Sequence, residues 1–102
     1  LPVAVSSALE SAVGISHGLK LAAALPHLDF ACGLGTGALL AVDVAALPII
    51  NGAIEVRDIA PDAGALIKYA ASNERLNWWK NRIRMTWSAG AQVMANERGW
   101  II

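Results

Sequence analysis

The sequence predicts an α/β fold made of two strand and helix units, followed by a segment of different character. Two short apolar runs, residues 1–5 and 28–31, each come before a helical pattern. They lie roughly 25 residues apart with one helix between them, as in a parallel βαβ crossover. After Pro48 a hairpin signal replaces this alternation. We therefore predict one unit over residues 1–47 and a second over residues 48–102.

The first strand and helix follow from local pattern. Residues 1–5 alternate valines within a short apolar run, and the hydroxyls of Ser6 and Ser7 compete with regular backbone pairing, which closes the strand. A helical pattern then covers residues 12–25. It ends at Pro26, because the residue before a proline disfavours the helical conformation.

The second strand and helix surround a glycine-rich turn. Residues 28–31 are short and apolar enough to form a buried strand. Gly33 and Gly35 then allow the backbone to turn tightly. A helix over residues 36–42 is expected next, with Thr36 as its N-cap.

The segment after Pro48 predicts a hairpin and two helices. Asn51-Gly52 is the strongest short hairpin signal and sits inside residues 49–57. Residues 61–71 read as a helix opened by a proline. A final helix is predicted to be capped by Asn73. Four large apolar residues lie along it at helical spacing: Trp78, Trp79, Ile83 and Trp87.

Composition excludes several classes of protein. Eight basic and eight acidic residues give no field that attracts a polyanion, so no nucleic-acid partner is expected. The longest uncharged run, residues 30–42, is shorter than the roughly 20 residues of a membrane-spanning helix. No export leader is visible, and the single cysteine, Cys32, forms no disulfide within the chain. These features favour the cytoplasm.

The hydrophobic content is high for a small domain. It reaches 56% without glycine, whereas soluble domains contain about 45–50% with glycine included. A lone domain of 102 residues should expose more polar side chains than this composition supplies. Either the chain self-associates through apolar surface, or the rest of its fold lies in another segment.

Three segments together resemble the actinobacterial type of o-succinylbenzoate synthase, of the enolase superfamily. They are VSSALESAVG at 5–14, LDFACGLGTGALLAVD at 28–43 and INGAIEVRDIAPD at 50–62. Their order and spacing also match, and WWKNRIR at 78–84 is similar to the closing helix of the family. Residues 85–102 depart from the pattern.

The resemblance implies that this chain is the C-terminal part of an enolase-type (β/α) barrel. Residues 1–5 would be strand seven and residues 28–31 strand eight, while the hairpin and last helices return to an α+β capping domain. Loops at the carboxyl ends of barrel strands carry active sites. We therefore expect the serine pair and the glycine turn to face one cleft.

The resemblance also implies a chemistry, namely dehydration of a succinyl-hydroxycyclohexadiene carboxylate during menaquinone synthesis. In the family, lysines transfer the proton and carboxylates hold Mg²⁺, on strands that precede those matched here. Lys20, Lys68 and Lys80 do not reproduce the paired spacing. We expect no catalytic residue and no metal ligand in this chain, which should bind no Mg²⁺ and be inactive alone.

Five residues are candidates for contact with, or support of, a small carboxylate substrate. Ser6 and Ser7 offer hydroxyls to a carboxylate or carbonyl oxygen, or else they cap a strand end. Gly33 and Gly35 offer backbone N–H groups to a carboxylate, or else they make a tight turn. Glu10 has two possible roles. It lies beside the family's strand-six lysine, which is encoded upstream, or its charge stabilises the N-terminus of the following helix.

Other chemical residues favour structural roles. His17 and His27 have no carboxylate at ligand spacing, and Cys32 has no evident base beside it. The basic and aromatic residues of 78–84 suggest a nucleic acid or a membrane surface, but burial of the tryptophans against a neighbour is the stronger interpretation.

Two other functions stay open at the level of sequence. One is a small non-catalytic α/β module that binds a carboxylate or assembles as an oligomer. The other keeps the superfamily and changes the reaction to racemisation or epimerisation.

Overall fold

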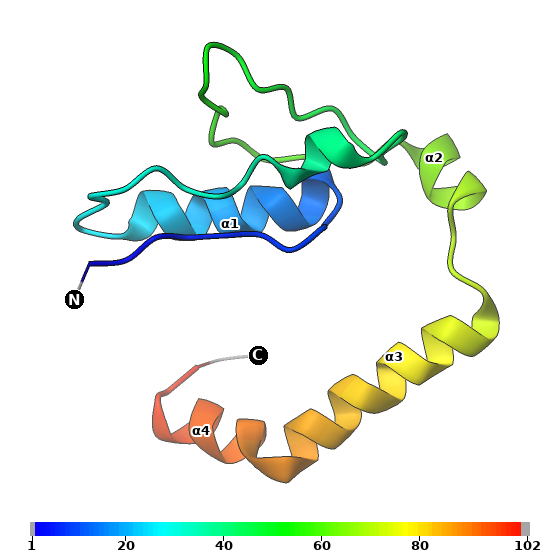
Figure 1. Cartoon of the computed structure of the whole chain (residues 1–102). Helices are drawn as coiled ribbons and strands as arrows, with labels where there is room; N and C mark the ends of the chain where they lie inside the picture. The colour runs from blue at the N-terminus through cyan, green and yellow to red at the C-terminus, as the bar shows by residue number, and fades with distance from the viewer. Residues whose placement is uncertain (1, 101–102) are drawn as a thin grey trace. The chain divides into compact units, whose positions relative to one another are not determined.

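The computed structural model describes residues 2–100 and consists of two compact units, Leu1–Tyr69 and Ala70–Ile102 (Figure 1). The first unit contains α1 (Ala12–Ala24), η1 (Thr36–Leu39) and α2 (Ala63–Lys68). The second contains α3 (Asn73–Thr86), η2 (Trp87–Ala91) and α4 (Gln92–Glu97).

Helix α1 carries the core of the first unit and confirms the helix predicted over residues 12–25. Ile15, Leu19 and Ala22 lie on its buried face. They form one cluster with Val5 and Leu34, which come from the segments on either side of the helix in sequence. Both segments run along α1 (Figure 1). Burial of these apolar side chains holds the two segments on the helix.

The two predicted strands do not form regular strands in the part of the chain that the structure describes, which excludes Leu1. A single parallel bridge joins Ser6 to Gly33. In it, the Ser7 N–H donates to the Gly33 carbonyl and the Gly33 N–H donates to the Val5 carbonyl, each at 2.9 Å. A lone pair of segments is a marginal sheet, because strands gain stability from further neighbours. The parallel direction agrees with a βαβ crossover.

The helix predicted over residues 36–42 is only a single 3₁₀ turn, η1. Gly35 stands at its N-cap position, and no side chain caps it. The predicted N-cap role of Thr36 is therefore wrong. Its hydroxyl lies 2.7 Å from the Ser7 hydroxyl instead. A hydrogen bond across the fold replaces the local cap.

The Asn51-Gly52 turn is confirmed, although the hairpin strands are not. Both residues have positive φ angles, 50° and 77°, as an Asn-Gly hairpin turn requires. Ile50 and Ala53 exchange two backbone hydrogen bonds of 2.8 and 3.0 Å. The ladder stops at this one bridge. Ile50 is exposed, so no packed face extends the pairing.

Helices α2 and α3 both begin with a side-chain cap. The Asp62 carboxylate accepts from the Ala65 N–H at 2.7 Å, and α2 is shorter than the helix predicted over residues 61–71. The Ser72 hydroxyl accepts from the Arg75 N–H at 3.2 Å. The predicted cap, Asn73, is instead the first helical residue. The error is one position, since both residue types cap well.

The second unit is a helical segment with a kink. Helix α3 continues into η2, where Gly90 adopts a φ of 144°, and α4 follows. A positive φ is open to glycine at little cost, so Gly90 provides the bend. Trp78 and Trp79 are about half-exposed, in contrast to the burial that the sequence predicted.

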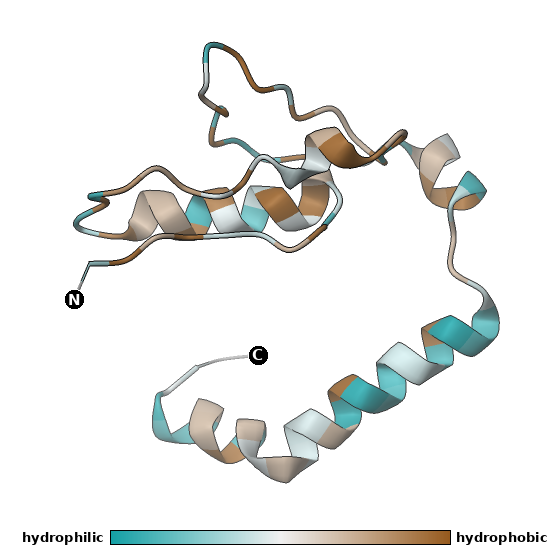
Figure 2. Cartoon of the chain, viewed as in Figure 1, coloured by the Kyte–Doolittle hydropathy of each residue, from teal (hydrophilic) through white to brown (hydrophobic). Residues whose placement is uncertain are grey.

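Apolar residues occur along the ribbon of both units (Figure 2), and many of their side chains are exposed. The exposed side chains include Leu21 and Phe30 of the first unit and Ile83 and Met85 of the second. Among residues 2–100, no helix has the length and apolar character needed to cross a bilayer.

Candidate functional site

The end of the first predicted strand and the glycine turn lie together. The Ser7 hydroxyl is 2.9 Å from the Gly33 carbonyl oxygen and 2.7 Å from the Thr36 hydroxyl. These contacts add to the two backbone hydrogen bonds of the parallel bridge. Two segments that are separated by helix α1 in sequence therefore share one hydrogen-bonded cluster, which we name the serine-glycine junction: Ser6, Ser7, Gly33 and Thr36.

Ser6 and Ser7 occupy different environments within the junction. The Ser7 hydroxyl is held by two partners. Ser6 is exposed, and its hydroxyl makes only a long contact of 3.5 Å with the Ser7 carbonyl. Bonds of that length are weak. Ser6 therefore keeps a hydroxyl hydrogen that can be donated elsewhere.

Gly33 lies close to the side chain of Ser6. A β-carbon at this position would lie 2.8 Å from the Ser6 hydroxyl oxygen, closer than carbon and oxygen atoms normally come. Its N–H donates to the Val5 carbonyl, so this group is already used. Gly35 lies at the start of η1, and no acceptor for its N–H occurs among residues 2–100. Of the two glycines, Gly35 is therefore the one whose N–H can donate to a ligand.

Glu10 stabilises the local turn before α1. Its carboxylate accepts from the Ala8 N–H at 3.2 Å in an exposed position. Its side chain also covers Gly14, where an added β-carbon would lie 2.6 Å from the Glu10 β-carbon. These contacts support a structural role for Glu10. A role beside a lysine encoded upstream stays a prediction.

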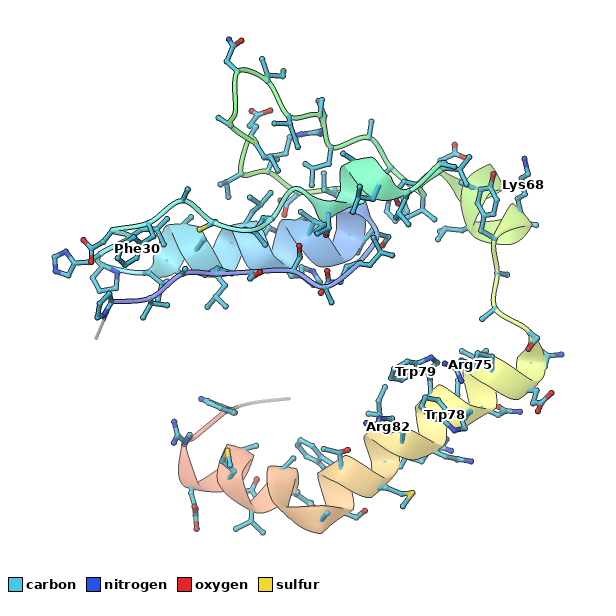
Figure 3. The ribbon with its side chains drawn as sticks, viewed as in Figure 1. Phe30, Lys68, Arg75, Trp78, Trp79 and Arg82 are labelled. Carbon is cyan, nitrogen blue, oxygen red and sulfur yellow. The ribbon has the colours of Figure 1, made fainter. Side chains whose placement is uncertain are left out.

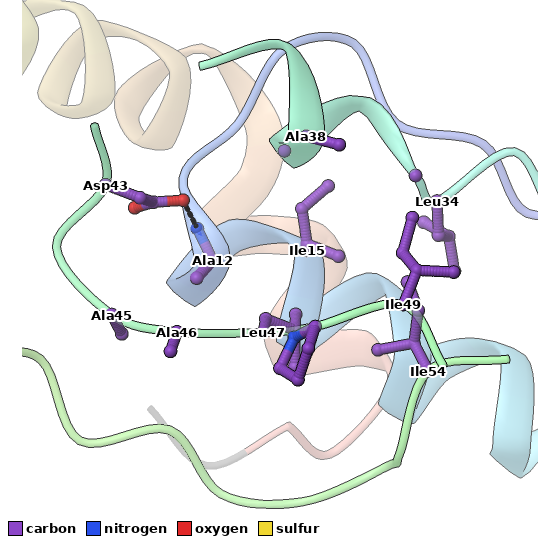
Figure 4. Close-up of a pocket in the computed structure, with 13 residues that line it drawn as sticks. Ala12, Ile15, Leu34, Ala38, Asp43, Ala45, Ala46, Leu47, Ile49 and Ile54 are labelled. Atoms are coloured by element: carbon purple, nitrogen blue, oxygen red, sulfur yellow. Dashed lines mark hydrogen bonds between the residues drawn. The ribbon is translucent and has the colours of Figure 1, made fainter. Parts of the chain in front are cut away.

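Asp43 is a residue that sequence reasoning missed. One carboxylate oxygen accepts from the Ala12 N–H at 2.8 Å (Figure 4), and the other accepts from the Val44 N–H at 2.6 Å. Ser11, the N-cap residue of α1, makes no side-chain capping bond. Asp43 therefore caps α1 from a distant loop. The only signal in the sequence was an acid closing the apolar run of residues 38–42.

A cavity of about 450 Å³ lies between α1 and the loop that contains Asp43 (Figure 4). Its walls are mostly apolar, with Gly35 and Asp43 among the lining residues. The cavity has the size and character of a small-molecule site. Ser6 and Ser7 do not line it, so only one of the predicted contact residues, Gly35, faces this space.

Lys20, Asp58 and Arg75 do not line this cavity. The Lys20 ammonium pairs with the exposed Asp58 carboxylate at 2.5 Å, and its hydrogen bond and charge lower the pKa of Asp58. On α3, the Arg75 guanidinium covers the Trp78 ring at 4.4 Å, and Trp79 packs against the same ring (Figure 3). In the described part of the chain, no three histidine, cysteine or acidic side chains gather to hold a metal ion.

Comparison with known proteins finds o-succinylbenzoate synthases of mycobacteria. The chain is 51% identical over 86 residues to that of Mycobacterium ulcerans, a match to 82% of this chain and 26% of the relative. It is 50% identical over 86 residues to that of Mycobacterium marinum, with the same coverage. It is 50% identical over 90 residues to that of Mycobacterium tuberculosis, a match to 86% and 27% respectively. No protein-family model matches the chain.

These matches confirm the resemblance predicted from the sequence segments. The chain spans about a quarter of the length of the curated relatives it matches. It is therefore similar to one part of an o-succinylbenzoate synthase.

Proposed function

We propose that this chain is the C-terminal part of an o-succinylbenzoate synthase. The complete enzyme would be a lyase that dehydrates a succinyl-hydroxycyclohexadiene carboxylate in menaquinone biosynthesis, in the cytoplasm. Identity of about half the residues over 82–86% of the chain carries this proposal. The serine-glycine junction supports it, because it joins two of the matched segments.

The bridge geometry supports placing both segments in a larger parallel sheet. Val5 and Ser7 direct their bonding groups toward Gly33, so the N–H and carbonyl of Ser6 point to the opposite edge. By the same alternation, Cys32 and Leu34 point away from the first segment. Both outer edges therefore present groups that neighbouring strands can pair with. In a (β/α) barrel, those neighbours are the strands on either side of strands seven and eight.

Within this proposal, the junction forms part of the wall that holds the substrate's carboxylate. The Ser6 hydroxyl and the Gly35 N–H are the donors still free for an anionic oxygen. Ser7 and Gly33 join the two strand ends that place these donors. Glu10 holds the turn that follows the first strand end.

Mg²⁺ does not fit the side chains of residues 2–100, because they provide no cluster of ligand oxygens. The family resemblance implies that other segments of the complete enzyme hold the ion and carry the lysines. The chain described here then supplies binding surface alone. Its inactivity in isolation stays a prediction.

A chimera tests the proposal. This chain replaces the matching quarter of the Mycobacterium tuberculosis relative, and o-succinylbenzoate formation is measured with added Mg²⁺. We expect turnover, with a raised KM after Ser6→Ala because one donor to the carboxylate is lost. Ser88→Ala, an exposed serine of η2, is the matched control and should leave KM unchanged. A folded chimera without turnover would contradict the proposal.

A further inference from the structure

The hydrogens of the serine-glycine junction can be placed by counting donors. The Ser7 hydroxyl carries one hydrogen and lies within bonding distance of two oxygens, those of Gly33 and Thr36. The Gly33 carbonyl can only accept, so the Ser7 hydrogen points to it. The short contact of 2.7 Å with Thr36 is then satisfied only if the Thr36 hydroxyl donates to Ser7.

We propose that Thr36 is a positioning residue that orders this chain of hydrogen bonds, an inference that rests on the proposed substrate wall. The bonds run from Thr36 to Ser7 and from Ser7 to Gly33. The Gly33 carbonyl also accepts from the Ser7 N–H, so both of its lone pairs are used. Thr36 is the first residue of η1, so its bond to Ser7 joins the glycine turn to the segment that precedes α1.

This order decides which serine meets the ligand. A carboxylate accepts hydrogen bonds and offers none. Both Ser7 and Thr36 have committed their only hydroxyl hydrogen within the junction, so each presents lone pairs alone. Ser6 donates its hydrogen only to a long, weak contact of 3.5 Å with the Ser7 carbonyl, so a carboxylate can take that hydrogen instead. Ser6 is therefore the hydroxyl that meets the carboxylate, while Ser7 and Thr36 hold the geometry of the junction.

Amide hydrogen exchange on the folded chimera tests the positioning step directly. Thr36→Val removes the donor while keeping a branched side chain, and Thr36→Ser keeps the donor. We expect the Ser7 and Gly33 amides to exchange about fivefold faster in the valine variant, as for the loss of one net hydrogen bond, and at the original rate in the serine variant. Equal exchange rates in all three proteins would overturn the inference.

Kinetics of the chimera test whether the positioning matters for the ligand. Thr36→Val should raise KM about fivefold with kcat nearly unchanged, since only binding groups are displaced. Thr36→Ser should restore KM. Thr36→Val should add nothing further in a Ser7→Ala background, because the two residues act as one unit.

The two proposals fail in different ways. An active chimera whose KM is insensitive to Thr36→Val contradicts the role of Thr36 and leaves the proposed function standing. A folded but inactive chimera contradicts the proposed function, and the exchange rates then decide the role of Thr36 alone.

Discussion

Replacing Asp43 by alanine should destabilise the first unit by removing the cap of α1. The carboxylate accepts the N–H groups of Ala12 and Val44, and Ala12 is only 2% exposed. Water therefore has little access to the Ala12 N–H once the carboxylate is gone. A donor left without a partner in a buried position lowers the free energy of unfolding.

The magnitude follows from two contributions at the helix start. Loss of a capping side chain costs about 1 kcal/mol. Loss of a negative charge beside the helix N-terminus costs about 0.5 kcal/mol more at partial exposure. Asp43→Ala should therefore lower the free energy of unfolding by about 1.5 kcal/mol. Asp43→Asn keeps one acceptor oxygen and should show a smaller loss.

Urea unfolding of the chimera, followed by circular dichroism, measures this difference. Asp29→Ala provides the control, because Asp29 is also an aspartate, lies exposed and makes no hydrogen bond among residues 2–100. The control should stay within about 0.5 kcal/mol of the original chimera. If Asp43→Ala were as neutral as the control, the proposed cap across the fold would be refuted.

Three further predictions follow from single contacts. Gly33→Ala should shift Ser6, since the new β-carbon meets its hydroxyl oxygen at 2.8 Å, and Ser6 amide chemical shifts report the change. Gly52→Ala should cost about 1 kcal/mol in urea unfolding, because a φ of 77° strains an alanine. Lys20→Ala should return the pKa of Asp58 toward its usual value in an NMR titration, because its depression comes from Lys20. Any stability from this pair is present at neutral pH and is lost as pH falls through the lowered pKa; an unchanged Asp58 titration would contradict the assignment.

Local signals in the sequence were sufficient for the features that local physics determines. Helix α1 follows the predicted range to within one residue, because an apolar face and a following proline both lie inside the segment. The Asn51-Gly52 turn was equally predictable, since positive φ angles at two adjacent positions favour this pair. The cap of α3 was misplaced by one residue, from Ser72 to Asn73, because either residue type can accept the N–H bond.

Features that depend on distant partners could not be read from local pattern. The strand character of residues 28–31 requires neighbours on both sides, whereas the parallel bridge in the described part of the chain joins Ser6 to Gly33, two residues beyond them. Asp43 acts on a helix that begins 31 residues earlier, and Thr36 bonds to a serine 29 residues away. The resemblance predicted that the serine pair and the glycine turn face one cleft. Ser7 and Gly33 are hydrogen-bonded, but of the predicted contact residues Gly35 alone lines the cavity described above, so the shared cleft stays a prediction.

The apolar composition and the pattern of burial lead to one physical argument. The chain is 56% hydrophobic, yet no large side chain among residues 2–100 is fully buried. Leu39 and Ile67 are 77% and 81% exposed, although each such side chain gains about 2 kcal/mol from full burial. Exposed apolar side chains in this density mark a surface that other protein covers. A chain that spans about a quarter of its relatives leaves enough polypeptide in them to provide that cover. The same excess of apolar surface makes self-association the competing outcome whenever the chain is studied alone.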